Sequence, residues 1–229
     1  MHTKLGNGRR AGSGPNPIRS GVAERVPAFL EGAPMSDPIR ILGLSGSLRR
    51  ASLNTALLRA ASELLPADAA LEIHPLADLP FFNEDVEAEG GLPDPVRALK
   101  ARIEAADALL LAVPEYNYSI APALKNALDW ASRPHGASVL VGKPVAILGA
   151  SAGMGTVRAQ LHLRDVAITT GLHVLNQPEI FVGRAAEKFD EALRLTDEPT
   201  RAILARMLQR LVHWTRAIQA STPIRESAA

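Results

Sequence analysis

The sequence predicts an open α/β domain in which helices cover both faces of a five-stranded parallel sheet. From residue 39 onward, short aliphatic segments alternate with longer segments whose apolar residues recur at helical spacing. The aliphatic segments are apolar throughout, which is typical of strands that are buried on both faces of a parallel sheet. Together these two patterns indicate a doubly wound fold.

Five strand–helix units follow one another in this pattern. The predicted strands lie at 39–44, 71–76, 108–113, 143–150 and 173–176. The predicted helices lie at 54–65, 92–106, 122–132, 156–171 and 198–219. Pro95 and Pro122 fall near the beginnings of the second and third helices, where proline is tolerated because the first N–H groups have no helical partners. The last helix is long and amphipathic, which suits packing against the sheet.

The composition restricts the core and the class of partner. Hydrophobic residues make up 47% of the 229-residue chain and aromatic residues 4%, so the core must consist of Ala, Val, Ile and Leu. The formal net charge of +1 gives no electrostatic reason to expect nucleic acid or an anionic membrane as a partner. No apolar run of the sequence approaches the roughly 20 residues that span a bilayer.

Cysteine and histidine usage excludes further kinds of site. The chain has no cysteine, which rules out disulfides and thiolate metal sites and is consistent with the cytoplasmic location that we expect. Its six histidines show no metal-ligand spacing, so we expect no metal site.

The first residues differ in composition from the rest of the chain. Residues 1–34 are rich in Gly, Pro, Arg and Ser, without sustained apolar periodicity or the apolar region of a secretory signal. We expect residues 1–36 to be a disordered extension, residues 37–221 to form the domain, and residues 222–229 to be a flexible tail. The alternatives for the first segment are a leader upstream of a start at Met35 and an arm that wraps a neighbouring subunit.

The predicted loop after the first strand, in the sequence GLSGSLRRASLNT, has the chemistry of a phosphate site. Its side-chain donors are Ser47, Ser52, Asn54 and Thr55. Arg49 adds a mobile positive charge, and the helix that follows adds the positive end of its dipole. The alternative is that Ser52 or Asn54 only caps this helix. The further donors and the arginine exceed what a cap requires, so we favour phosphate.

The predicted loop after the third strand contains both tyrosines of the chain, in the sequence PEYNYS (114–119). In a doubly wound sheet, ligands bind outside the carboxyl ends of the strands where the strand order reverses. Of the two common orders, 2-1-3-4-5 places this point between the loops after the first and third strands. The alternative for Tyr116 and Tyr118 is core packing with the hydroxyls at the surface.

Two motifs that would indicate other functions are incomplete. GLSGS does not have the G-x-S-x-G order of a nucleophile elbow. GMGTVR carries Arg158 where the last glycine of G-x-G-x-x-G belongs, so a Rossmann dinucleotide site is not expected.

Three segments carry a family resemblance: GSLRRASLNT, PEYNYSIAPALKNALDW and SAGMGTVRAQLHLR. They resemble the NAD(P)H-dependent FMN reductases of the flavodoxin-like superfamily, in the branch that includes bacterial quinone and chromate reductases. The resemblance extends from about residue 39 to residue 181. It implies a flavodoxin-like fold with strand order 2-1-3-4-5, FMN as cofactor, and NADPH or NADH as co-substrate. It also implies a homodimer or homotetramer with FMN near the interface.

The resemblance assigns binding roles by position. The matching cofactor-binding positions are Ser45, Ser47, Arg49, Ser52, Asn54 and Thr55 at the phosphate, Pro114, Glu115, Tyr116, Asn117 and Tyr118 along the flavin ring, and Ser151 and Gly153 near its pyrimidine side. Alternation points Tyr118 away from Tyr116, so Tyr118 is also a candidate for the substrate entrance or a subunit contact. Family members commonly carry two adjacent glycines shortly before the position that Arg158 occupies in this chain. Here Gly155 is followed by Thr156, which leaves the shape of this loop open.

Other polar and aromatic residues are expected to serve the architecture. The acidic sequence FFNEDVEAEGG predicts a solvated loop beside the active-site cleft. Phe81 and Phe82 either shield this cleft or anchor the loop, and we favour the anchor. Arg158, Arg164 and Glu179 either form ion pairs between subunits, as the resemblance implies, or are surface charges.

The leading functional hypothesis is an FMN-dependent oxidoreductase with a ping-pong mechanism. NAD(P)H gives hydride to the flavin, the nicotinamide leaves, and a small-molecule acceptor takes its place; the candidates are quinones, free flavin, azo compounds and chromate. The cofactor carries the chemistry, so no catalytic side chain is expected. The alternatives are a non-enzymatic flavodoxin-type electron carrier or redox sensor and a phosphate-binding α/β hydrolase.

Overall fold

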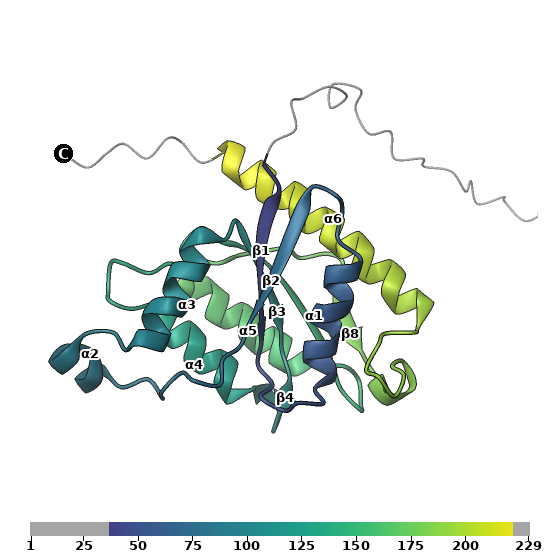
Figure 1. Ribbon diagram of the computed structural model, residues 1–229, viewed down its shortest axis with the longest axis horizontal. Coiled ribbons are helices and arrows are strands. Elements are labelled where there is room, and N and C mark those ends of the chain that lie inside the picture. The colour runs from purple at the N-terminus through teal and green to yellow at the C-terminus, as the bar shows by residue number, and fades with distance from the viewer. Residues whose placement is uncertain (1–36, 222–229) are drawn as a thin grey trace, which may run out of the picture. The chain divides into compact units, whose positions relative to one another are not determined.

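The computed structural model describes residues 37–221, and Figure 1 shows the arrangement of their helices and strands. The predicted N-terminal extension (1–36) and C-terminal tail (222–229) lie outside the described residues. Among the helices that the structure describes, none is both long and apolar enough to cross a lipid bilayer.

A parallel sheet forms the centre of the fold and confirms the predicted class and strand order. Its strands lie in the order β2-β1-β3-β6-β7, and β8 also pairs with β6. They span Ala69–His74 (β2), Ile39–Ser45 (β1), Ala108–Ala112 (β3), Pro144–Ala150 (β6), His173–Val174 (β7) and Ile180–Val182 (β8). All of these strand pairs are parallel, with Ile41 opposite Ala108 and Leu109 opposite Val145.

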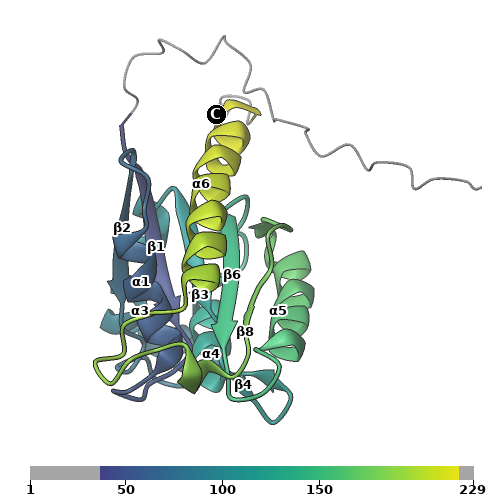
Figure 2. The same ribbon diagram turned by 90° about the vertical axis from the view of Figure 1, so that its right-hand side faces the viewer.

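Helices cover both faces of the sheet, as Figures 1 and 2 show. On one side lie α1 (Leu53–Glu63) and α6 (Glu198–Ser221), and on the other lie α3 (Asp94–Ala105), α4 (Pro122–Ala131) and α5 (Val157–Thr170). The predicted helices agree with these bounds to within two residues at each end.

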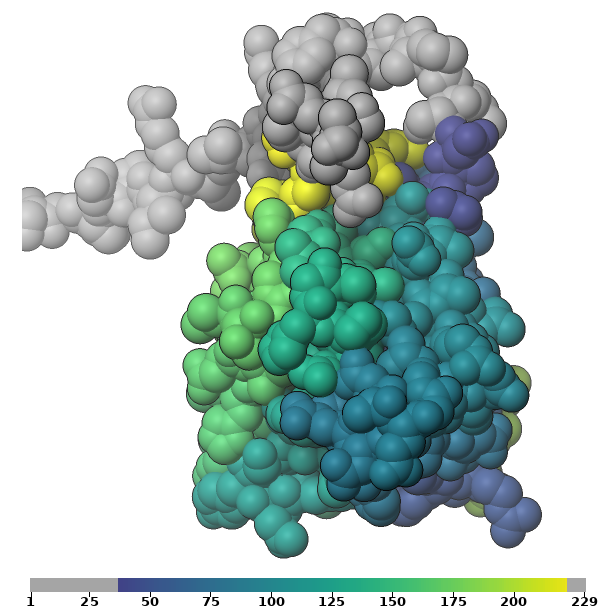
Figure 3. All heavy atoms as spheres, turned by 90° about the vertical axis from the view of Figure 1, so that its left-hand side faces the viewer, coloured from purple at the N-terminus to yellow at the C-terminus, as the bar shows by residue number. Residues whose placement is uncertain are grey.

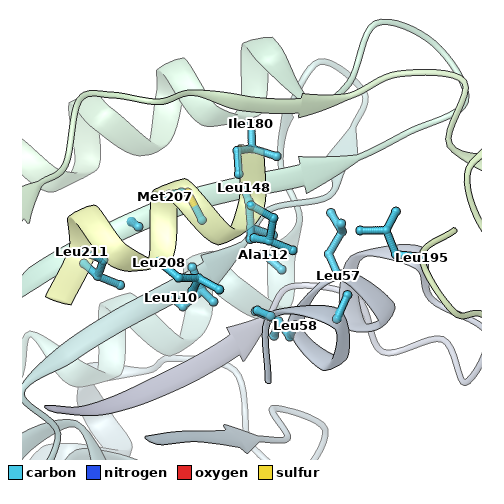
Figure 4. Packing of buried hydrophobic residues seen from close by; sticks show 14 of the residues in the cluster. Leu57, Leu58, Leu110, Ala112, Leu148, Ile180, Leu195, Met207, Leu208 and Leu211 are labelled. Atoms are coloured by element: carbon cyan, nitrogen blue, oxygen red, sulfur yellow. The ribbon is translucent and has the colours of Figure 1, made fainter. Parts of the chain in front are cut away.

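The two covered faces explain why the central strands are apolar at every position. Leu110 of β3 packs with Leu57 of α1 and Leu208 of α6 in one core cluster, which Figure 4 shows from close by. The alternate residues Leu109 and Leu111 belong to a second cluster under α3, α4 and α5. Burial of this aliphatic surface, at about 25 cal/mol per Å², is the main stabilising contribution available to a core with few aromatic residues.

The fifth strand differs from the prediction because it is split in two. The sequence predicts one strand at 173–176, whereas β7 pairs with the beginning of β6 and β8 pairs with its end. Pro178 lies between them and has no N–H to continue a ladder. The second strand also lies two residues earlier than predicted, since Ala69 and Ala70 pair with β1 and Pro75 follows the last strand residue.

A short helix, α2 (Glu84–Gly90), replaces the solvated loop that the sequence predicts. Asn83 caps it by accepting a hydrogen bond from the backbone N–H of Asp85 (2.9 Å). Acidic residues in the first turn interact favourably with the positive end of the helix. The helix has no buried residue within the described part of the chain, so it contributes nothing to the core. Figure 3 views the molecule from the side on which α2 and α3 lie, coloured blue to teal.

Candidate functional site

Three loops meet at the carboxyl ends of β1, β3 and β6. Because these strands are parallel neighbours, the loops that follow them, 46–52, 114–121 and 151–156, begin at the same edge of the sheet. In Figure 2 the arrow of β6 points to this edge, where β4 also lies. Backbone hydrogen bonds of 2.9 Å tie the start of the first loop to β3 and the end of β3 to β6. The structure therefore brings together the three segments that the sequence predicts to bind a ligand.

A pocket of about 400 Å³ lies between the first two loops. Its lining residues are Gly46, Leu48, Arg49, Tyr116, Pro122 and Ala123. Arg49 and Tyr116 are predicted site residues, whereas the other four residues are not among those predicted to bind a ligand. Pro122 and Ala123 lie in the first turn of α4. The sequence signal that could have identified them as pocket residues is a helix that begins with small residues directly after the tyrosine motif.

A larger hollow of about 620 Å³ lies between α3 and the strands β1 and β2. Ala98, Ala101 and Arg102 of α3 line it together with residues such as Arg40 and Ala70, which lie toward the amino ends of their strands. Ligands of doubly wound sheets bind at the carboxyl ends. We therefore place the functional site at the smaller pocket.

Gly46 lets the first two loops approach each other closely. A Cβ atom at this position would lie 2.7 Å from Cδ of Pro114 and 3.0 Å from Cβ of Leu124. Real Cβ atoms do not come so close to other heavy atoms, so a larger residue here would push the loops apart. Pro114 is itself buried, and it lies at this edge of the sheet next to Gly46.

Hydroxyl groups fold the first loop onto itself. The Ser45 hydroxyl oxygen accepts hydrogen bonds from the backbone N–H of Ser47 (3.3 Å) and from the hydroxyl of Thr55 (2.8 Å). The Ser52 hydroxyl accepts from the backbone N–H of Thr55 (3.3 Å) and is the N-cap of α1. Ser52 therefore caps α1, whether or not it also contacts a ligand, and Ser45 and Thr55 also hold the loop in shape.

Two groups of the first loop are left available for an anion. The Ser47 hydroxyl oxygen is buried and has no hydrogen-bond partner within residues 37–221, which is unusual for a buried polar atom. Arg49 is exposed and forms no ion pair with an acidic residue that the structure describes. Both belong to the loop that leads into α1, whose N-terminal end is positive. These residues fit the phosphate group of FMN.

Asn54 binds the protein backbone instead of projecting freely toward the pocket. Its side-chain amide donates to the carbonyl oxygen of Ala150 (3.0 Å) and accepts from the N–H of Ala150 (3.0 Å). All of these groups are buried. The two bonds clasp the first turn of α1 to the end of β6, so the geometry favours a structural role for this side chain.

The second loop contains a small β-hairpin. Its strands are β4 (Glu115–Tyr116) and β5 (Ser119–Ile120), which pair antiparallel with each other. The two turn residues, Asn117 and Tyr118, both have positive φ, +48° and +70°. This is the backbone of the tight hairpin turn that favours Asn and Gly, and it costs Tyr118 about 1 kcal/mol.

The hairpin separates the roles of the two tyrosines. Tyr116 is 44% exposed and lines the pocket, whereas Tyr118 is 65% exposed. The guanidinium of Arg158, on α5, lies 3.9 Å from the ring centre of Tyr118, a cation–π contact. The core-packing alternative is therefore wrong for both tyrosines, and Tyr118 contacts α5.

Glu115 also reaches α5 from the hairpin. Its carboxylate accepts hydrogen bonds from the backbone N–H groups of Arg158 (3.0 Å) and Ala159 (3.3 Å), and the Arg158 guanidinium lies 3.2 Å away. The Glu115 side chain is 14% exposed. The geometry thus directs its carboxylate to the N-terminus of a helix.

The third loop leads into α5 and is closed by its own hydrogen bonds. The Ser151 hydroxyl donates to the carbonyl oxygen of Gly155 (2.6 Å), and Gly155 has a φ of +83° that favours glycine. Thr156, which replaces the expected second glycine, is fully buried. It fits because Gly149 has no side chain; a Cβ atom there would lie 1.8 Å from the Thr156 hydroxyl oxygen. Gly153 is exposed at the tip of the loop.

Aromatic and charged residues anchor the segment that carries α2. Phe82 packs edge-on against Trp130 with ring centres 4.9 Å apart, and its N–H donates to the side chain of Asn126 (2.8 Å). Arg133 pairs with Glu87 at 2.7 Å. The predicted anchor is confirmed for Phe82, whereas Phe81 is exposed.

The charged residues that were candidates for ion pairs between subunits form ion pairs within one chain. Arg158 pairs with Glu115, and Arg164 pairs with Glu179 at 3.6 Å. A metal site is not indicated either, since the described residues contain no group of three or more acidic or histidine side chains placed to hold an ion.

Comparison with known proteins gives consistent matches over the same residues. Residues 39–187 match the family described as NADPH-dependent FMN reductase. An NAD(P)H-dependent FMN reductase of Pseudomonas aeruginosa is 48% identical over 186 residues, which cover 81% of this chain and all of the relative. An NADPH:quinone oxidoreductase of Arabidopsis thaliana is 41% identical, over 79% of this chain and 94% of the relative.

A solved structure agrees with these sequence matches. The flavoenzyme FerB of Paracoccus denitrificans, an NAD(P)H:(acceptor) oxidoreductase, is 37% identical to this chain. Its structure superimposes with a TM-score of 0.69, over 78% of this chain and 97% of FerB.

Proposed function

Since the chain belongs to the NADPH-dependent FMN reductase family, and is thus an enzyme that uses FMN with NADPH or NADH, we propose that it reduces quinones by a ping-pong mechanism. The observation that carries this proposal is the pocket between the loop after β1 and the hairpin after β3. Quinone reduction is supported by the name of the plant relative and by the apolar lining that Leu48, Pro122 and Ala123 provide for a flat acceptor.

We assign the cofactor's parts to the three loops. Ser47, Arg49 and the N-terminus of α1 would hold the phosphate. The Ser47 hydroxyl has no hydrogen-bond partner and Arg49 has no ion-pair partner among the described residues, and both Arg49 and the helix N-terminus carry positive charge. Tyr116 and Asn117 would lie along the ring, and the loop that contains Gly153 would face its pyrimidine side. FMN held by these residues would supply the chemistry of hydride acceptance from the nicotinamide and of electron transfer to the acceptor, so we expect no acid or base from the chain itself.

The chain's residues contribute by binding and by shape. Tyr116 and the first turn of α4 line the same pocket, and we expect this pocket to hold one planar partner on the ring at a time. Reductant and acceptor would therefore bind in turn, which is the basis for the ping-pong order. Free flavins, azo compounds and chromate are further acceptors to test, and we expect the reaction to take place in the cytoplasm.

The matches remove the two rival interpretations. Relatives with names that denote oxidoreductases are not expected for a non-enzymatic electron carrier or for a phosphate-binding hydrolase. An enzyme that couples NADPH or NADH to an acceptor accounts for the same residues.

We further propose that the enzyme is a homodimer or homotetramer that uses the outer face of α5. Leu161 and Ile168 lie two turns apart on this helix and are 52% and 81% exposed. Large apolar side chains at such spacing on a surface helix suit a subunit contact. Ile168→Asp should lower the molar mass measured by light scattering, and an unchanged mass would refute this face as the interface.

Spectroscopy of the purified protein tests the function directly. The protein, reconstituted with FMN, should show the visible absorption bands of bound flavin. Under anaerobic conditions NADPH should bleach them, and a quinone added afterwards should restore them without further NADPH. A protein that binds no FMN would overturn the proposal, and bleaching that requires quinone to be present would refute the ping-pong order.

A further inference from the structure

The hairpin 115–120 is not held in place by the central sheet. Its two strands pair with each other, and its two-residue ladder is too short to be stable by itself. Both turn residues adopt positive φ, which adds strain. Contacts from outside the hairpin must therefore fix its position over the pocket.

These outside contacts converge on one helix. The Ser119 hydroxyl and Nδ1 of His162 lie 3.0 Å apart, and Tyr118 stacks with Arg158. Glu115 accepts from two backbone N–H groups of α5 and pairs with the Arg158 guanidinium. The Ser119–His162 contact is exposed and Tyr118 is 65% exposed. By contrast, the Glu115 side chain is 14% exposed and makes three charge-assisted contacts, so we take Glu115 as the strongest of the three ties.

The N-terminus of α5 needs this carboxylate. Thr156 occupies the N-cap position but makes no side-chain capping bond that the structure describes. Its hydroxyl instead accepts from the side chain of Gln160 (3.1 Å). The carboxylate of Glu115, from a loop distant in sequence, satisfies two N–H groups and neutralises the positive end of the helix.

We propose that Glu115 is a positioning residue that sets the distance between two walls of the cofactor site. One wall is the hairpin with Tyr116 and Asn117, and the other is the loop 151–156, which continues directly into α5. The carboxylate that joins them binds α5 and not the flavin. This inference rests on the proposed function, because it assumes that FMN lies between the walls.

The test measures FMN affinity, by quenching of flavin fluorescence, together with thermal stability. Glu115→Ala should raise the Kd for FMN about tenfold or more. Glu115→Gln keeps an acceptor for the α5 N–H groups but loses the charge, so its Kd should lie between those of the wild type and the alanine variant. Should the alanine variant fail to fold, the glutamine variant carries the test.

Asp197 provides a matched control. It accepts from the backbone N–H of Thr200 (3.0 Å) in the first turn of α6 and lies 3.4 Å from Lys188. The pKa of Asp197 is lowered, chiefly by the hydrogen bond from the Thr200 hydroxyl. The hydrogen bond from the Thr200 N–H and the charge of Lys188 lower it further. Asp197→Ala therefore removes a carboxylate cap of the same kind from a helix outside the site. Its melting temperature should fall as in Glu115→Ala, while its Kd for FMN stays unchanged.

A double-mutant cycle separates positioning from general destabilisation. If Glu115 acts through the hairpin, Glu115→Ala should add little to the Kd of Asn117→Ala, because the residue that it positions is already gone. Fully multiplicative effects, or wild-type affinity in both Glu115 variants, would overturn the inference. A wild-type protein that binds no FMN would instead refute the proposed function.

Discussion

The loop after β1 and the hairpin after β3 line the same pocket but are held by different kinds of contact. The first loop is folded by hydroxyl groups within ten residues of one another, around Ser45, Ser52 and Thr55. The hairpin depends on Glu115 and its partners on α5, more than forty residues away in the chain. The proposed cofactor site thus combines a first loop that is folded by local hydrogen bonds with a hairpin that is placed by tertiary contacts.

The contact between the two regions should give the largest effect when it is broken. Gly46→Ala places a Cβ atom 2.7 Å from Pro114 and should destabilise the fold by about 2 kcal/mol or more, since the loops must separate. FMN binding should be lost with it. Urea unfolding measures the first effect and flavin fluorescence the second. Gly90→Ala is the control, because a Cβ atom there meets nothing within 4 Å.

Removal of the Asn54 clasp should be the next largest effect. Asn54→Ala leaves the buried N–H and C=O of Ala150 without their side-chain partner, which should cost about 2 kcal/mol in the free energy of unfolding. FMN affinity should fall only through this loosening. Wild-type stability of the variant in urea would show that the clasp is not a support of the loop.

Arg49→Ala should separate binding from folding in the first region. Loss of a charged phosphate contact should weaken FMN binding about tenfold or more, whereas the unfolding free energy should change by less than about 0.5 kcal/mol because Arg49 is exposed. Arg50→Ala, also at an exposed position, is the matched control. Full FMN occupancy of the Arg49 variant through purification would count against its role.

The smallest effect is expected at the tip of the hairpin. Tyr118→Gly relieves a φ of +70° but removes the cation–π contact with Arg158, two effects of about 1 kcal/mol or less with opposite sign. Stability in urea should therefore change by no more than about 0.5 kcal/mol. A large loss would mean that Tyr118, and not Glu115, is the main tie between hairpin and α5.

The same division decides what could be predicted from sequence. The parallel sheet follows from aliphatic strands alternating with helical periodicity, whereas its strand order was implied by the family resemblance. The position of the first loop follows from the strand before it and the helix after it, and its hydroxyl and arginine content suggested a phosphate site. The capping of α5 by Glu115 could not be predicted, because the sequence around Thr156 offers a capping residue of its own. The clasp by Asn54 was missed for a similar reason, since its partner Ala150 is a backbone group with no signal in its side chain.

Errors in the fold have equally specific causes. The last strand is divided, and β8 is only three residues long, too short for a pattern in the sequence. The acidic segment before α3 forms α2 because Asn83 caps it, although its composition suggests a solvated loop. In the first place a proline without an N–H interrupts the strand, and in the second a side-chain cap allows a helix that the acidic composition does not suggest.

The construction of α2 has a consequence for protein engineering. Its base is fastened by Phe82 and Arg133, while the helix itself contributes no side chain to the core among the described residues. Substitutions at its exposed positions should leave the free energy of unfolding nearly unchanged. The tip of α2 is therefore a suitable attachment point for a dye or a surface tether, because a probe there would not disturb the core.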